Sequence, residues 1–138
     1  MKRILGLGVA VLVALAVGWA WGASGKSEVS RALRIAELHD SLLEGRAAVL
    51  DARLDIYSVN FGEASRHLEA ARSALRTAET RLAGLGGNGK EDADRLKIAL
   101  TRIDEAQRAA GQLNQNANAL AADAATAIGD VLGSISRR

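Results

Sequence analysis

The chain has 138 residues, of which 18 are Lys or Arg and 16 are Asp or Glu, and it contains neither cysteine nor proline. Without cysteine it can form no disulfide and no thiolate metal site. Lys2 and Arg3 supply the small basic excess, and beyond Trp21 the only aromatic residues are Tyr57 and Phe61. This composition argues against nucleic acid as a partner, because two aromatic residues are too few for base stacking and the remaining Lys and Arg are balanced by Asp and Glu.

The first segment, Ile4 to Trp21, reads ILGLGVAVLVALAVGWAW and carries no charge. A helix of this length spans roughly 27 Å, close to the thickness of a bilayer's hydrocarbon core. Residues 1–25 are therefore predicted to be a membrane anchor or, alternatively, a signal peptide cleaved after Ala20 or Gly22.

The residues around and within this segment predict its orientation and its contacts. Lys2 and Arg3 precede it, and such positive charge is usually retained in the cytoplasm. We therefore expect a single-pass membrane protein whose helical domain lies in the periplasm or otherwise outside the cytoplasm; cleavage would instead give a secreted protein. Small residues recur at every fourth position and would allow two membrane helices to pair closely. These residues are Gly6, Ala10, Ala14, Gly18 and Gly22.

Residues 26–138 are expected to form one all-α domain, because Ala, Leu, Arg and Glu dominate and apolar residues recur every three or four positions. A first helix is expected over about 27–58. One apolar row with this spacing runs from Val29 to Phe61 and is interrupted only by Asp40. A second row repeats every seven residues, at Ile35, Leu42, Val49 and Ile56. Together the rows predict a wide apolar face packed in a bundle.

A second helix is expected over 61–83. The apolar spacing alone also permits a single helix over 29–85. Asn60 and Gly62 are poor helix formers, however, and Asn60 with Glu63 has the form of an N-terminal capping box. These residues favour a helical hairpin over one continuous helix.

Within this second helix, Phe61 precedes Ala64, Leu68 follows four residues on, and Ala71 comes three residues later. Residues 60–82 thereby resemble the second helix of a tetratricopeptide-type helical hairpin, and the resemblance implies such a hairpin here. The aromatic position of that family's first helix is occupied by Asp55, and no second copy appears at the family's period of about 34 residues. Ordinary heptad packing explains the same positions.

The glycine-rich loop 84–90 reads GLGGNGK and is expected to end the second helix. It has the form G-x-x-x-x-G-K of a phosphate-binding loop. Glu91, however, stands where that loop needs a Ser or Thr to hold magnesium, and a helix rather than a strand precedes it. We therefore expect no nucleotide, and a third helix over 91–135.

The expected fold is thus an N-terminal transmembrane or signal helix followed by a long-helix hairpin or a three-helix antiparallel bundle. The large residues of the apolar rows are predicted to form its helical interface. They are Leu50, Leu54, Tyr57, Phe61, Leu68, Leu75, Leu96, Ile103, Leu113 and Leu120.

Catalytic and metal-binding patterns are missing from the sequence. His39 and His67 stand apart from any second ligand at metal-binding spacing, and no Gly-x-Ser-x-Gly occurs. We therefore expect no enzyme activity, no metal and no cofactor. The chain is interpreted as a non-enzymatic, membrane-anchored interaction or scaffold protein of the bacterial envelope, with another protein or a second copy as its partner. The alternative is a cleaved, soluble exported protein that binds an apolar ligand or a lipid between its helices.

Overall fold

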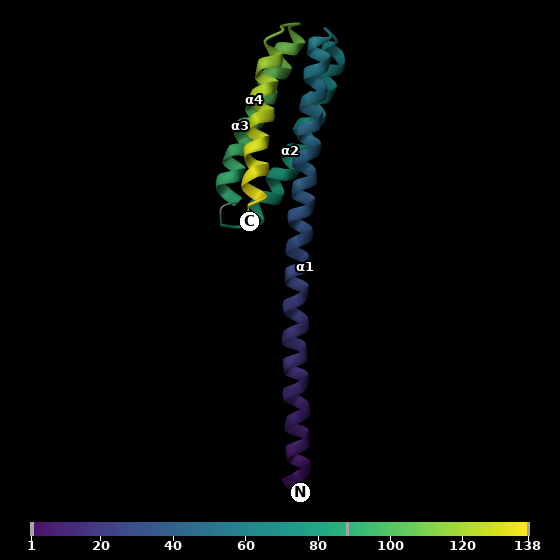
Figure 1. Ribbon diagram of the computed structural model, residues 1–138, viewed down its shortest axis with the longest axis vertical. Coiled ribbons are helices and arrows are strands. Elements are labelled where there is room, and N and C mark those ends of the chain that lie inside the picture. Colours follow the sequence, from purple (N-terminus) through teal and green to yellow (C-terminus); the bar gives the residue numbers. More distant parts are fainter. Residues whose placement is uncertain (1, 88, 138) are drawn as a thin grey trace. The chain divides into compact units, whose positions relative to one another are not determined.

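The computed structural model describes the backbone of residues 2–87 and 89–137 and the side chains of residues 28–87 and 89–137. These residues form four helices and no strand, so the predicted all-α class is confirmed. The helices are α1 (Lys2–Tyr57), α2 (Phe61–Ala83), α3 (Gly89–Gly111) and α4 (Ala117–Ile135) (Figure 1). The chain divides into one unit of residues Met1–Ile35 and a second of residues Ala36–Arg138. The second unit is a helical bundle.

The predicted membrane segment, Ile4 to Trp21, lies outside the residues whose side chains are described, as does the pairing stripe from Gly6 to Gly22. Over residues 28–87 and 89–137, no helix is both long and apolar enough to cross a membrane.

The bundle is built from the end of α1 and from α2, α3 and α4, which alternate in direction because each connecting turn is short (Figure 1). Its core consists of aliphatic side chains with alanine between them. Alanine lets helix axes approach closely. The largest fully buried apolar side chains are Leu38, Leu42, Val49, Ile56, Leu68, Leu75, Leu82, Leu96, Ile103, Ile128 and Val131.

The turn between α1 and α2 confirms that the chain reverses near residue 60. The amide of Asn60 donates to the carbonyl of Asp55 over 2.8 Å, and Val59 adopts a left-handed φ of 61°. This pattern is a Schellman motif, with Val59 in the place usually taken by glycine. The expected capping box does not form. Asn60 is the N-cap residue of α2 but its side chain makes no cap hydrogen bond, and the carboxylate of Glu63 pairs instead with Arg66.

The glycine-rich loop joins α2 to α3 and uses its glycines for backbone geometry. Gly86 and Gly87 both have positive φ, which glycine adopts without steric cost. Gly89 is buried at the start of α3, where an added Cβ would lie 2.6 Å from the carbonyl oxygen of Leu82. The glycines of this loop therefore allow α3 to begin directly against the end of α2.

The single third helix predicted over 91–135 is wrong, and the bundle has four helices where the sequence suggested two or three. Helix α3 ends at Gly111, and α4 begins at Ala117. Leu113 has a left-handed φ of 55°, and the amide of Asn114 donates to the carbonyl of Ala109 over 2.9 Å. A second Schellman motif thus ends α3. The apolar spacing continues through this turn, which is why the sequence pattern did not mark it.

Candidate interaction surface

Helix α1 is apolar on two opposite sides in the bundle. One side packs into the core through Leu38, Leu42, Val49, Ala52 and Ile56, all with no exposed area. The other side is exposed and carries the first apolar row seen in the sequence. We call these residues the α1 seam: Ala36, Asp40, Leu43, Ala47, Leu50, Leu54 and Tyr57.

The exposure of the α1 seam increases toward the end of the helix. Leu43 and Leu50 are 44% and 40% exposed, whereas Leu54 is 67% and Tyr57 81% exposed. Single exposed apolar residues are ordinary, but several in continuous helical spacing are typical of a surface that another helix covers. In the unit Met1–Ile35, Val29 and Leu33 are exposed too, and their sequence spacing continues the same row.

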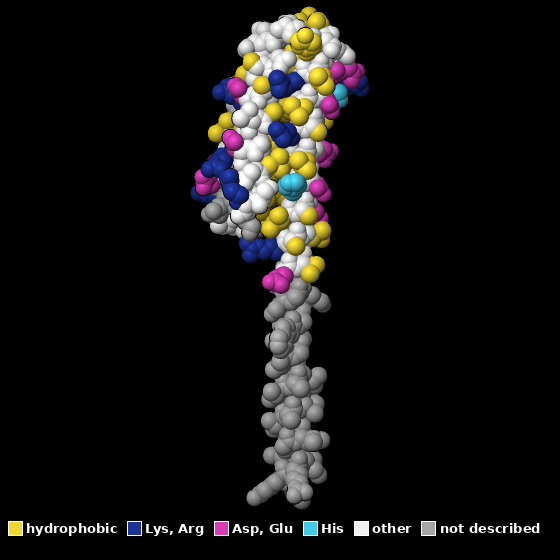
Figure 2. All heavy atoms as spheres, in the orientation of Figure 1, with side chains coloured by type: hydrophobic (Ala, Val, Ile, Leu, Met, Phe, Trp, Pro, Cys, Tyr) yellow, Lys and Arg dark blue, Asp and Glu magenta, His cyan; other side chains and the backbone are white. Residues whose placement is uncertain are grey.

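Charged residues of opposite sign border the α1 seam. Glu37, Glu44 and Asp51 follow it at seven-residue intervals on one side, and His39, Arg46 and Arg53 do so on the other. Figure 2 shows apolar side chains of α1 along the bundle, with Lys and Arg near α4 and Asp and Glu along the opposite edge. The sorting of charge by side gives this surface a distinct electrostatic pattern.

Contacts with α2 and α4 fix the borders of the seam. The Nε of Arg53 donates to Oδ1 of Asn118 over 3.0 Å. A groove lies beside this contact, lined by Leu50, Leu54 and Tyr57 together with the two polar partners. On the other border, Glu37 forms an ion pair with Arg81 of α2. Both partners come from neighbouring helices, so they limit the rotation of α1 about its own axis and keep the seam outward.

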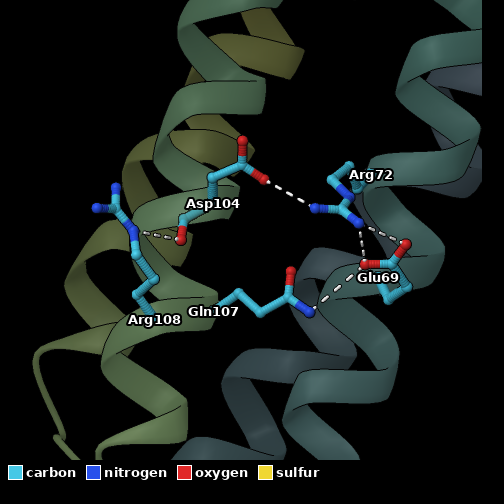
Figure 3. A network of polar contacts seen from close by, with 5 residues as sticks. All are labelled: Glu69, Arg72, Asp104, Gln107 and Arg108. Atoms are coloured by element: carbon cyan, nitrogen blue, oxygen red, sulfur yellow. Dashed lines mark hydrogen bonds and ion pairs between the residues drawn. The ribbon is translucent and has the colours of Figure 1, made fainter.

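A polar network fastens α2 to α3 (Figure 3). Arg72 pairs with Glu69 at 2.7 Å and reaches Asp104 of α3 at 3.4 Å. The amide of Gln107 donates to Glu69 over 3.5 Å, and Arg108 donates to the backbone carbonyl of Asp104 over 3.3 Å. The hydrogen bond from Arg72 holds the pKa of Glu69 below its usual value, and the same bond raises the pKa of Arg72. Every member of this network has a polar partner, and the contacts of Arg72 with Asp104 and of Gln107 with Glu69 join α2 to α3.

The predicted interface residues fall into two groups. The structure buries five of them in the core: Phe61, Leu68, Leu75, Leu96 and Ile103. It leaves Leu50, Leu54, Tyr57 and Leu113 exposed, while Leu120 is half-buried. Leu50, Leu54, Tyr57 and Leu113 thus lie on the surface of the bundle rather than in its core. The core residues Leu38, Gly45 and Ala52 were missed, because their positions lie outside the two rows that the spacing identified.

One further charged contact joins α1 and α2. Nδ1 of His67 lies 2.7 Å from Oδ2 of Asp55, which ties α2 to α1. Among the described residues, no three His, Asp or Glu side chains gather in a group that could hold a metal ion.

Comparisons with known proteins found no match: no family model, no curated protein and no solved structure is similar to this chain.

Proposed function

We propose that the chain is a non-enzymatic, membrane-anchored interaction module of the bacterial envelope, with its helical bundle outside the cytoplasm. The observation that carries the interaction role is the α1 seam, in which Leu54 and Tyr57 remain largely exposed on a helix that already has a buried face. A solvated face of a helix is ordinarily polar, so an apolar one indicates that a further helix binds there.

The anchoring part of the proposal is supported by the sequence of residues 4–21. Their length and lack of charge match a bilayer, and Lys2 and Arg3 favour a cytoplasmic N-terminus. The role of the anchor would be to hold the bundle at the membrane surface, where its partners are concentrated.

Orientation is tested by fusing a reporter enzyme to Arg138. A reporter that is active only outside the cytoplasm should be active there, and one that requires the cytoplasm should be silent. Extraction of membranes with alkaline carbonate should leave the fusion in the pellet, because a spanning helix is retained. Activity of the cytoplasmic reporter, or full release by carbonate, would contradict the proposed placement.

Interaction through the α1 seam is tested in cells with a photo-crosslinking amino acid. Incorporated at Leu54, it should give a discrete adduct of defined mass. Incorporated at Thr77, which is exposed on α2, it should give none. Equal labelling at both positions, or no adduct at Leu54 in a correctly localised protein, would remove the basis for this function.

A further inference from the structure

We propose that the α1 seam pairs with the α1 seam of a second copy of this chain, as a parallel, in-register, two-stranded coiled coil. The inference rests on the proposed function and names its partner. Its evidence is the arrangement of apolar and charged residues along one helix whose conformation the bundle already fixes.

The spacing of the seam is that of a heptad repeat, with apolar residues alternately three and four apart. Asp40, Ala47 and Leu54 occupy the a positions. The d positions are Ala36, Leu43, Leu50 and Tyr57. The apolar residues that α1 buries in the bundle fall on the c and f positions, which lie roughly opposite the a and d positions at about 100° per residue. The seam therefore faces away from the core of the bundle, with Asn118 of α4 at its border.

The charges beside the seam identify both the partner and its direction. All three acidic residues, Glu37, Glu44 and Asp51, occupy e positions. On the other side, His39, Arg46 and Arg53 occupy g positions. In a parallel pair, a g residue of one helix faces the e residue five positions further along the other.

This arrangement brings Arg46 of each copy against Asp51 of the other, and His39 against Glu44. An antiparallel pair would instead place e against e and g against g, so that like charges face each other. The pattern is thus complementary to itself in one orientation only.

The charges that would pair between copies are available. Glu44, Arg46 and Asp51 are exposed, and within the part of the chain that the structure describes they make no hydrogen bond or ion pair. Glu37 and Arg53, which find no charged counterpart in the parallel register, are instead held by Arg81 and Asn118.

The composition of the seam indicates moderate association. Asp40 and Ala47 at a positions bury little apolar area, and two copies of Asp40 would face each other. A polar residue at one a position fixes register at a cost in stability. The bundle compensates, because α1 is already helical and little conformational entropy is lost on pairing. Replacing Asp40 with Leu should therefore tighten self-association by at least tenfold.

Cysteine scanning tests the pairing directly, because the natural chain has no cysteine. In the full-length protein, Leu43→Cys and Leu50→Cys should each form a disulfide with its own counterpart under mild oxidation. Thr77→Cys, exposed on α2, is the control and should stay reduced. Cross-linking only between a Leu43→Cys chain and an Ala47→Cys chain would show an antiparallel pair, in which d positions face a positions, and would overturn the proposal.

Charge reversal tests the same pairing without oxidation. Arg46→Glu and Asp51→Arg should each weaken self-association of the detergent-solubilised chain about tenfold, since two pairs per dimer become repulsive. The double variant Arg46→Glu/Asp51→Arg should restore it. Both positions are exposed and unpaired in the bundle, so the circular dichroism melting curve, recorded at a dilution at which the chain is monomeric, should not change.

A wild-type chain that stays monomeric, or a double variant no better than the singles, overturns the proposal. A seam that cross-links only to a different protein overturns the second copy as partner and leaves the interaction function standing. Failure of membrane retention would instead count against the anchor.

Discussion

Gly45 lies where α1 packs closely against Leu75 of α2. A Cβ there would lie 2.6 Å from Cδ2 and 2.9 Å from Cγ of Leu75, which has no exposed area and little room to move. Glycine lowers helix stability by about 1 kcal/mol relative to alanine. At Gly45 that loss is offset by the close helix contact that it permits.

Replacing glycine with alanine should therefore change the free energy of unfolding in opposite directions at Gly45 and Gly129. Gly45→Ala should lower the free energy of unfolding by up to about 2 kcal/mol, because overpacking outweighs the gain in helix propensity. Gly129→Ala, in α4 with no atom within 4 Å of the added Cβ, should raise it by about 0.5–1 kcal/mol. Urea unfolding of the two variants measures both. Stabilisation by Gly45→Ala would show that the α1–α2 contact is looser than described.

Val59 and Leu113 occupy the left-handed position of the two Schellman motifs, with φ of 61° and 55°. For a β-branched residue such as Val59 this conformation is strained by about 1–2 kcal/mol. Val59→Gly should therefore stabilise the bundle by about 0.5–1 kcal/mol, after allowing for the greater freedom of glycine in the unfolded chain. Thermal melting followed by circular dichroism measures the change. Val59→Ala, which keeps the Cβ, is the control and should raise the melting temperature much less. Equal increases for the two variants would show that the left-handed backbone at residue 59 is not their cause.

Glu69 should make the stability of the bundle depend on acid pH. Its pKa in the folded chain lies below the usual 4.5 because Arg72 donates to it, so the unfolded chain takes up the proton first. The contribution of ionised Glu69 to the free energy of unfolding is complete above its usual pKa of 4.5. It is lost as the pH falls through the pKa of Glu69 in the folded chain. The melting temperature of wild type should thus exceed that of Glu69→Gln by a constant amount down to about pH 5, with the gap narrowing below it. Arg72→Gln should reproduce this behaviour, and a gap independent of pH would exclude the pair as its cause.

At the scale of elements, the end of α3 marks the main departure from the sequence prediction. The residues from Gln112 to Asn116 form the turn, where neither proline nor a glycine at the left-handed position signals a helix end. Asn114 supplies the local alternative, since its Oδ1 accepts the amide of Asn116 over 2.9 Å. Such hydrogen bonds from the backbone to a side chain replace those of a continuing helix, which explains why the chain turns here.

Spin labels at Thr101 and Thr126 test this turn. Both residues are exposed, on α3 and α4 respectively. Antiparallel neighbours should bring the labels within about 20 Å of each other, given interaxial distances of about 10 Å. One continuous helix would separate them by about 37 Å at 1.5 Å per residue. A narrow distribution near the longer distance would restore the single helix and remove α4 as a separate element.

The second helix and the α2–α3 loop could be placed from sequence because their signals are local. Asn60 and Gly62 mark one end of the helix, and the glycines of residues 84–90 mark the other. The direction in which α1 faces was not accessible in this way. Both of its rows are apolar, and only the packing of Leu42, Val49 and Ile56 against the other helices decides which is buried.

At the scale of the whole molecule, the bundle and the N-terminal segment are expected to act together. If residues 4–21 span a membrane and the α1 seam pairs with a second copy, as proposed, confinement to the membrane would raise the effective concentration of the copies. Removal of residues 1–25 should then weaken the pairing.

Native mass spectrometry of the full-length chain, released from membranes in detergent, tests the central claim most directly. The main species should have twice the 14.4 kDa mass of the chain, with residues 1–25 retained. The Arg46→Glu variant should contain a larger fraction of monomer than the wild type. A wild-type chain present as a single copy at every concentration, or one shortened by removal of the N-terminal segment, would contradict the account.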